Sequence, residues 1–185
     1  MQEVESNIKW ERFLSGDDAA YSLIYNEFVQ ILFRYGLRFT SDSELIKDCI
    51  QELFTTLYKN RKRLVSPANV KVYLFICLKN NLTRAIYRKE KVKYIEEETI
   101  SFLLEPTVEE QFINDESEGI RKNMVEKILS VLTPRQKEII YYRYIQELDF
   151  SEICSLMHLN YQSAQNLLQR SINKVRELFL PGASK

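Results

Sequence analysis

The chain has 185 residues, of which 45% are hydrophobic and 12% aromatic, enough apolar surface for folded cores and too much for a disordered protein. Gly and Pro are scarce, with four residues of each, and long helices tolerate few of either, so the composition favours an all-α fold. The formal net charge is zero, which at first argues against nucleic-acid binding.

The charges are, however, sorted into blocks along the chain. Residues 1–58 have a net charge of −5, and residues 59–93 have one of +10 because Glu90 alone opposes eleven basic side chains. Residues 94–118 have a net charge of −9, and residues 119–185 one of +4. A local charge of +10 can attract phosphate groups even in a neutral protein.

The sequence contains no signal for export, membrane insertion, metal binding or catalysis. The N-terminus is acidic where a secretory signal is basic, and no apolar run approaches the ~18 residues of a membrane span, so we expect a cytoplasmic protein without membrane insertion. Cys49, Cys77 and Cys154 are far apart and form no CxxC pair, which predicts reduced, buried thiols. No GxxxxGK[ST] or HExxH motif occurs, and we expect no catalytic residue, cofactor or metal.

The first expected domain covers residues 1–93 and is helical. Apolar residues recur at steps of three and four from Trp10 to Tyr35, which is a helical period. A further helix is expected from near Ser41, because Ser41 and Glu44 fit a capping box. Its apolar stripe consists of Leu45, Cys49, Leu53, Phe54 and Leu57.

A basic turn follows at residues 60–67, and a third helix is expected from about Ala68 to Arg88 or beyond. Residues 94–118 are expected to form an acidic linker, because they contain Pro106 and lack a sustained apolar stripe. The apolar exception in this linker is the run Phe102, Leu103 and Leu104. These three side chains could dock on a partner or form a short helical turn, and the sequence does not decide between the two.

The second expected domain, residues 119–185, begins with a helix from about Ile120 to Val131. Thr133 and Pro134 then form a strong helix start, with Thr as the N-cap and Pro at the first helical position.

Two further helices complete this domain. Asp149 and Glu152 fit a capping box that opens a short helix, and a three-residue turn follows at His158, Leu159 and Asn160. The last helix is expected from Tyr161 to about Leu178, with Asn160 as its N-cap, ended by Pro181 and Gly182.

The two helices joined by the three-residue turn are typical of a DNA-binding helix-turn-helix, although a plain helical hairpin has the same outline. The exposed face of the last helix favours the first reading, because Gln and Asn can pair with adenine edges and Arg with guanine or phosphate. The DNA-contacting residues expected on this helix are Gln162, Ser163, Gln165, Asn166, Gln169, Arg170 and Lys174.

Several motifs resemble the sigma-70 family of bacterial RNA polymerase sigma factors. Those similar to region 4 are Leu132–Ile140, Arg143–Tyr144 and Leu148–Ile153, with Asn166–Ser171 as the recognition helix, and those similar to region 2 are Asp48–Tyr58 and Tyr73–Lys89. A short acidic linker in place of a middle domain points to the extracytoplasmic-function (ECF) subgroup. The resemblance implies two small helical domains, a region 2 bundle and a region 4 helix-turn-helix, joined by that linker.

The resemblance also implies partners and site residues. The chain would bind core RNA polymerase, through the β′ clamp and the β flap, and promoter DNA, and an anti-sigma factor would control it. The residues implied in core-polymerase binding are Asp48, Gln51, Glu52, Phe54 and Thr55, with Thr56 on the same face and Leu53 and Leu57 shared between core and interface.

The same resemblance assigns residues 59–93 to the minus-10 promoter element and places a pocket for a flipped base at about residues 61–70. The residues implied in minus-10 binding are Arg61, Arg63, Asn69, Tyr73, Asn80, Arg84, Arg88 and Lys89. Core packing remains an alternative for Tyr73, which lies in an apolar run.

The sequence departs from the family pattern at two places. His158 stands where the turn commonly has Gly, so a left-handed backbone there would cost roughly 1 kcal/mol, and we expect His158 to be a turn residue rather than a ligand. Gln165 and Leu167 stand where many relatives have Lys or Arg, which weakens phosphate attraction in this domain.

Two other functions compete with a sigma factor. A stand-alone helix-turn-helix transcriptional regulator would explain the second domain, but it has no need of the Asp48–Tyr58 motif or of the basic segment. An enzyme acting on nucleic acid would need carboxylates gathered from separate elements, which the sequence does not favour.

Overall fold

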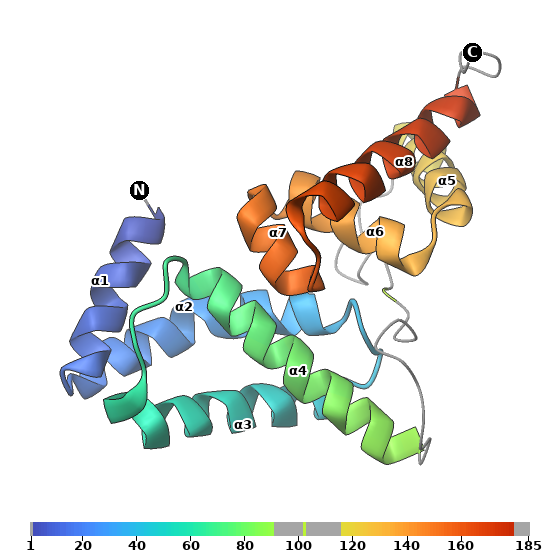
Figure 1. Cartoon of the computed structure of the whole chain (residues 1–185). Helices are drawn as coiled ribbons and strands as arrows, with labels where there is room; N and C mark the ends of the chain where they lie inside the picture. The colour runs from blue at the N-terminus through green and yellow to red at the C-terminus, as the bar shows by residue number, and fades with distance from the viewer. Residues whose placement is uncertain (1, 91–101, 103–115, 180–185) are drawn as a thin grey trace. The chain divides into compact units, whose positions relative to one another are not determined.

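The structure is a computed structural model that describes residues 2–90, 102 and 116–179, with side chains for residues 4–89, 102 and 124–179. The chain divides into two compact units, Met1–Thr99 and Ile100–Lys185. Every regular element in the described part of the chain is a helix, as Figure 1 shows. The all-α prediction is therefore confirmed.

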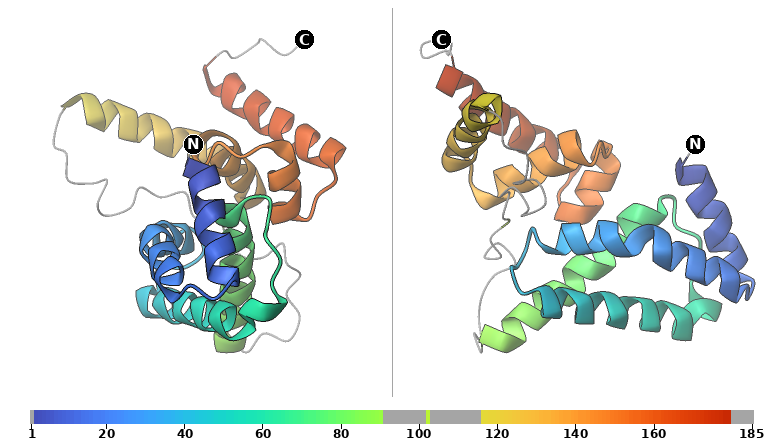
Figure 2. Two further views of the ribbon diagram at one scale, coloured as in Figure 1. Left: turned by 90° about the vertical axis from the view of Figure 1, so that its left-hand side faces the viewer. Right: turned by 180° about the vertical axis from the view of Figure 1, so that it is seen from behind.

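The first unit is a bundle of four helices. Its elements are α1 (Gln2–Leu14), α2 (Asp18–Gly36), α3 (Ser43–Asn60), a 3₁₀ turn (Arg61–Arg63) and α4 (Val70–Glu90). Helix α2 packs against the other three helices, and α3 packs against α4 (Figure 2). The core of the bundle includes Trp10, Phe13, Ile24, Leu32, Tyr35, Ile46, Leu53, Leu74, Phe75, Leu78 and Leu82.

The helical period from Trp10 to Tyr35 covers two helices rather than one. Gly16 has a φ of +106°, a backbone conformation that is available to Gly at little cost. Asp17 then caps α2, because its carboxylate accepts hydrogen bonds from the backbone N–H groups of Ala19 and Ala20. The first unit therefore gains a separate N-terminal helix, which the sequence period alone did not predict.

Close packing at the C-terminal end of α2 requires Gly36. A Cβ atom there would lie 2.6 Å from Cγ2 of Ile46 on α3, so any larger residue would push the two helices apart. The neighbouring Tyr35 ring stacks on Phe75 of α4 with centroids 4.0 Å apart. These contacts fix how α2 packs against α3 and α4.

Two expected helix starts in the first unit are wrong by one or two residues. Helix α3 is capped by Asp42, whose side chain accepts from the backbone N–H of Leu45, and not by Ser41. Helix α4 begins at Val70 rather than Ala68, where Oδ1 of Asn69 accepts from the backbone N–H of Val72.

The second unit contains the expected helix-turn-helix. Its elements are α5 (Glu116–Val131), α6 (Pro134–Ile140), a π-helical segment (Tyr141–Ile145), α7 (Phe150–Met157) and α8 (Tyr161–Phe179). The predicted capping boxes at Thr133 and Asp149 are both present, and Asn160 caps α8 by accepting from the backbone N–H of Ser163 at 2.8 Å.

The connection between α6 and α7 has a conformation that the sequence did not predict. Helix α6 widens into a π-helical segment, and Glu147 has a left-handed backbone with a φ of 57°. The backbone N–H of Leu148 then donates to the carbonyl of Tyr142 at 3.0 Å. The chain thereby turns before the N-cap of α7.

One residue of the expected linker packs within the second unit. Phe102 is buried, and its ring lies 5.3 Å from the ring of Tyr141 and 6.2 Å from that of Tyr142. Helix α5 also begins inside the range expected for the linker. Leu103, Leu104 and the expected helix stop at residues 181–182 lie outside the described residues.

Candidate nucleic-acid and partner interfaces

One face of α3 presents the polar residues expected to bind a partner. Asp48, Gln51, Glu52 and Thr55 are exposed, and with Thr56 and Lys59 they line a shallow hollow on this helix. Their spacing of three and four residues places them on one side of α3. The structure therefore brings four of the five expected polymerase-binding residues together on one surface.

Phe54 lies elsewhere, because its side chain is in the core of the bundle. It is 2% exposed, and its ring contacts Tyr25 at 4.9 Å and Tyr21 at 6.2 Å, both from α2. Leu53 and Leu57 are buried as well. In this structure these three apolar residues support the exposed face of α3 from beneath rather than forming part of it.

Two basic residues of the segment 59–89, one near its start and one at its end, form ion pairs with carboxylates. Arg61 Nη1 lies 2.9 Å from Asp18 Oδ1, and its guanidinium stands 5.1 Å from the centre of the Tyr58 ring. Lys89 Nζ lies 2.5 Å from Asp42 Oδ2. The hydrogen bond from Lys89, together with that from the backbone of Leu45, lowers the pKa of Asp42.

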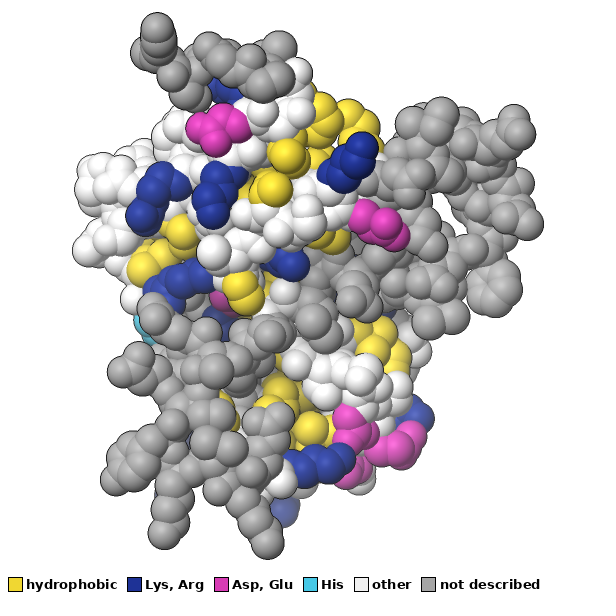
Figure 3. Space-filling view, turned by 90° about the vertical axis from the view of Figure 1, so that its right-hand side faces the viewer, with side chains coloured by type: hydrophobic (Ala, Val, Ile, Leu, Met, Phe, Trp, Pro, Cys, Tyr) yellow, Lys and Arg dark blue, Asp and Glu magenta, His cyan; other side chains and the backbone are white. Residues whose placement is uncertain are grey.

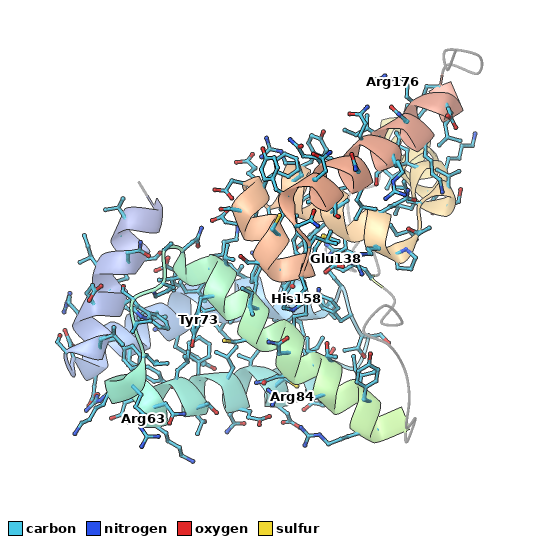
Figure 4. All side chains as sticks on the ribbon, viewed as in Figure 1. Arg63, Tyr73, Arg84, Glu138, His158 and Arg176 are labelled. Carbon is cyan, nitrogen blue, oxygen red and sulfur yellow. The ribbon has the colours of Figure 1, made fainter. Side chains whose placement is uncertain are left out.

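Three further expected minus-10 residues on α4 are exposed on its surface. Asn80, Arg84 and Arg88 are exposed, and Arg84 bonds within its own helix, to the Asn80 carbonyl at 3.2 Å and to Asn81 Oδ1 at 2.7 Å. Arg63 is exposed in the turn before α4, and Figure 4 labels Arg63 and Arg84 on their separate elements. A basic surface of this kind suits contacts with a phosphate backbone.

Tyr73 is half-buried and belongs in part to the core. Its ring lies edge-on to that of Trp10, with centroids 5.5 Å apart, and burial, with a smaller contribution from Cys77, raises the pKa of Tyr73 to about 12. The phenol is therefore neutral throughout the physiological range. Both interpretations left open for Tyr73 remain compatible with this position.

The loop before α4 combines an exposed apolar side chain with a tether to α1. Val65 is 82% exposed, although it lies among basic and polar neighbours. Farther along the loop, Asn7 Nδ2 donates to the Ala68 carbonyl at 3.2 Å. This tether joins residues 61 positions apart, so no local sequence signal could have revealed it.

The turn of the helix-turn-helix has a left-handed backbone at His158, the position where the family resemblance led us to expect glycine. His158, labelled in Figure 4, has φ 51° and ψ 45°, and its backbone N–H donates to the Cys154 carbonyl. His158 is exposed and serves as the C-cap of α7, as expected for a turn residue.

The outer face of α8 is rich in amides and poor in charge. Gln162, Asn166, Gln169, Arg170 and Lys174 are exposed, and Ser163 and Gln165 are half-buried. Two pairs of amide side chains bond to each other along this face, Gln162 to Asn166 at 3.1 Å and Gln169 to Asn173 at 3.1 Å. All the expected residues of this helix thus lie on or beside one surface.

Leu167 packs inward on the same helix and is 9% exposed. The position where the family resemblance led us to expect a basic residue therefore contributes to the core. Lys174 Nζ donates to the Val131 carbonyl at 3.4 Å, and Arg170 Nε donates to the Asn166 carbonyl of its own helix at 3.3 Å.

The second unit also exposes apolar side chains in the middle of α5 and at the C-terminal end of α8. Met124, Val125, Leu178 and Phe179 are between two-fifths and one-half exposed. In Figure 3, hydrophobic side chains reach the surface in the upper part of the view, between Lys and Arg side chains. Exposed apolar side chains that form a contiguous patch can mark a protein–protein contact, and the sequence pattern alone did not predict this exposure.

The described residues form no obvious metal site. No three His, Cys, Asp or Glu side chains gather among them in a way that could hold an ion. The three cysteines are free, but only Cys49 is buried as expected, whereas Cys77 and Cys154 are half-buried. Burial raises the pKa of Cys49 and Cys77. No described helix combines the length and apolar character that crossing a bilayer requires.

Family comparisons match each unit separately. The model described as "Sigma-70 region 2" matches residues 24–92, and the model described as "Sigma-70, region 4" matches residues 122–175. The first match begins inside α2 and so leaves out α1. The presence of a region 2 match argues against a simple helix-turn-helix regulator.

The similarity to known proteins extends over nearly the whole chain. The ECF RNA polymerase sigma factor SigM of Bacillus subtilis (strain 168) is 22% identical over 161 residues, which cover 87% of this chain and 96% of SigM. The fold resembles that of CnrH in complex with the cytosolic domain of CnrY, at a TM-score of 0.60 and 16% identity, with 94% of this chain and 96% of the other covered. It also resembles the sigma factor RpoE in complex with the anti-sigma factor NepR from Bartonella quintana, at a TM-score of 0.56 and 16% identity, with 89% and 98% covered.

Proposed function

Since the chain belongs to the sigma-70 family and is an ECF sigma factor, a transcription initiation factor that binds core RNA polymerase and promoter DNA, we propose which of its surfaces performs each step. The observation that supports this division is that regions 2 and 4 match in order, each within a separate unit. The first unit would bind the polymerase and the minus-10 element, and the second unit would bind the minus-35 element.

The exposed face of α3 is the proposed contact with the β′ clamp of core polymerase. It offers Asp48, Gln51, Glu52 and Thr55 to a partner while buried side chains hold the helix in place. Two carboxylates on such a face favour a partner surface with basic side chains. Phe54 supports this face from the core, and we assign it no direct contact in this conformation.

The basic turn and α4 are the proposed minus-10 surface. Arg63, Arg84 and Arg88 are exposed and could follow a DNA backbone, as single-strand binding surfaces do. Asn80 is an exposed candidate for base contacts, whereas Asn69 caps its own helix. Arg61 and Lys89 would exchange their carboxylate partners for phosphates on binding.

The exposed face of α8 is the proposed minus-35 surface. Its amide side chains can pair with base edges in the major groove, and its left-handed turn at His158 sets the position of α8 relative to α7. We propose that residues 1–93, 94–118 and 119–185 correspond to region 2, the linker and region 4. We also propose that the protein acts in the cytoplasm, has no catalytic activity of its own and binds promoters as part of the polymerase holoenzyme.

An anti-sigma factor is a further proposed partner. The RpoE structure is a complex with an anti-sigma factor, and this chain shares its fold. The apolar side chains Met124, Val125, Leu178 and Phe179 offer a surface for a protein partner, which we propose to be the β flap of polymerase in the holoenzyme and the anti-sigma factor in the inhibited state.

The experiment that tests this proposal is a pull-down of core RNA polymerase followed by run-off transcription from genomic fragments. We expect stoichiometric binding and discrete transcripts from the wild-type protein, and weakened binding by Gln51→Ala. Gln30→Ala is the matched control, because Gln30 is also exposed but lies on α2. Tight binding to duplex DNA without any binding to core polymerase would overturn the proposal.

A further inference from the structure

We propose that Tyr161, the first residue of α8, is a specificity residue that recognises a thymine through its C5-methyl group in the minus-35 element. This inference deepens the proposed function and rests on it, because it requires α8 to enter the major groove. This contact would add an aromatic side chain to a surface on which the residues expected from the sequence to contact DNA are polar or basic.

The first observation is the place of Tyr161 on the helix. Asn160 caps α8 through the backbone N–H of Ser163, so Tyr161 lies in a fixed first turn. Its side chain is 56% exposed. In helix-turn-helix proteins the N-terminal residues of the second helix are those that contact base edges, and Tyr161 therefore lies at the leading end of the reading helix.

The second observation is that the Tyr161 ring packs against a side chain that lies outside its own helix. The ring of Phe150, at the start of α7, lies 5.4 Å from that of Tyr161 at a tilt of 53°. The guanidinium of Arg143 stands 5.5 Å from the centre of the Phe150 ring, and Arg143 Nη1 donates to the Leu148 carbonyl at 2.9 Å. Because the ring is already packed on one side, binding would cost little additional side-chain entropy.

The third observation is the chemistry of the surrounding surface. The first nine residues of α8 contain no Lys or Arg, and Arg170 is the first basic residue of the helix. The exposed neighbours Gln162 and Asn166 already bond to each other. An apolar ring therefore stands beside amides, and among the base edges of the major groove the thymine methyl is the apolar group.

The test uses the full-length protein assembled with core polymerase and a promoter duplex recovered from the run-off experiment. Each thymine of the upstream element is replaced singly by deoxyuridine, which lacks only the methyl group, and holoenzyme affinity is measured by competition. We expect one thymine at which this replacement weakens wild-type binding about fourfold, the effect of one buried methyl group. Tyr161→Gln should weaken binding to the thymine duplex by a similar factor and should not distinguish the two bases at that position.

Two variants serve as controls. Tyr161→Phe keeps the ring and should behave as the wild type. Tyr144→Gln removes another tyrosine of the second unit with nearly the same exposure, 58%, and should retain full discrimination between thymine and deoxyuridine. A thermal unfolding scan verifies that each variant is folded, which we expect because both side chains are largely exposed.

Three results would overturn the inference. Tyr161→Gln could retain the wild-type discrimination at every thymine, the wild type could respond to no deoxyuridine replacement, or Tyr161→Phe could lose the discrimination, which would assign the contact to the hydroxyl group. If the wild-type holoenzyme bound no promoter specifically, the proposed function itself would fail, and this outcome is distinct from the other three.

Discussion

The two units differ in how their proposed DNA surfaces are charged. In the first unit, the strongest positive block of the chain is partly neutralised by carboxylates, with Arg61 paired to Asp18 and Lys89 to Asp42. In the second unit, the proposed reading helix has amide pairs, a buried Leu167 and no basic residue before Arg170.

This difference indicates a division of labour between the units. Contacts with phosphates supply affinity that depends on salt but little on sequence, whereas amides and apolar groups distinguish base edges. The first unit therefore suits attraction to DNA, and the second suits discrimination between promoter sequences. If the two properties are separate, a substitution in one unit should change one property and leave the other unchanged.

The largest expected effect comes from Phe54→Ala, which should destabilise the first unit without affecting the second. Removing a buried aromatic ring costs about 3–5 kcal/mol, and Phe54 packs against two rings of α2. Urea denaturation followed by circular dichroism should show the first unit's transition moved to lower urea. Thr55→Ala, at the exposed neighbouring position, should change the free energy of unfolding by less than about 0.5 kcal/mol.

A different result for Phe54→Ala would be informative. If the variant kept its stability but no longer bound core polymerase, Phe54 would contact the partner directly, as the family resemblance implied. The present burial of Phe54 would then describe the free protein alone.

The next effect concerns the salt dependence of promoter binding. The affinity falls as salt concentration rises, and Arg84→Ala should make the negative slope of log affinity against log salt concentration shallower by about one, because one phosphate contact is lost. Gln169→Ala should leave that slope unchanged and reduce discrimination between promoter sequences. Equal changes in slope for both variants would contradict the proposed division of labour.

The sequence predicted the second unit more accurately than the first. The caps at Thr133, Asp149 and Asn160 and the left-handed turn at His158 depend on residues within four positions of one another, so their chemistry is visible in the sequence. The same local signals do not show that α6 widens before Glu147, because that backbone conformation has no side-chain signature.

In the first unit the errors come from contacts between distant residues. The period of α3 identified an apolar stripe but not that Tyr21 and Tyr25 of α2 cover Phe54. The tether from Asn7 to Ala68 likewise joins segments far apart in the sequence. Periodicity predicts that a face is buried, and only the packing of the whole bundle shows what covers it.

A smaller effect is expected from the left-handed turn of the helix-turn-helix. Because His158 has φ 51°, His158→Gly should relieve backbone strain and raise the free energy of unfolding of the second unit, by at most about 1 kcal/mol. His158→Val should lower it, since a β-branched residue tolerates this conformation poorly. Thermal unfolding of the three proteins provides the comparison, and a stabilised Val variant would show that the turn is not left-handed in solution.

The smallest effect concerns the ion pair between Lys89 and Asp42, both at the protein surface. Asp42→Asn keeps a good N-cap for α3 but removes the charge that holds Lys89, so DNA affinity should rise modestly, by less than Arg84→Ala lowers it. Exposed ion pairs are weak, and their partners exchange readily for phosphate. Unchanged or weaker DNA binding by this variant would show that Asp42 does not compete for Lys89.

The pH dependence of stability measures the contribution of the Asp42 carboxylate. The hydrogen bonds from Lys89 and the backbone of Leu45 lower the pKa of Asp42 from its ordinary value of 3.8, so the ionised carboxylate stabilises the folded state. This contribution is complete above the unfolded pKa and is lost as pH falls through the lower folded pKa. Wild-type stability should therefore fall more steeply than that of Asp42→Asn below about pH 4. Because Asp17 and Asp149 also have lowered pKa values, the difference between the two curves, rather than either curve alone, isolates the contribution of Asp42, to its ion pair with Lys89 and to the cap of α3 together.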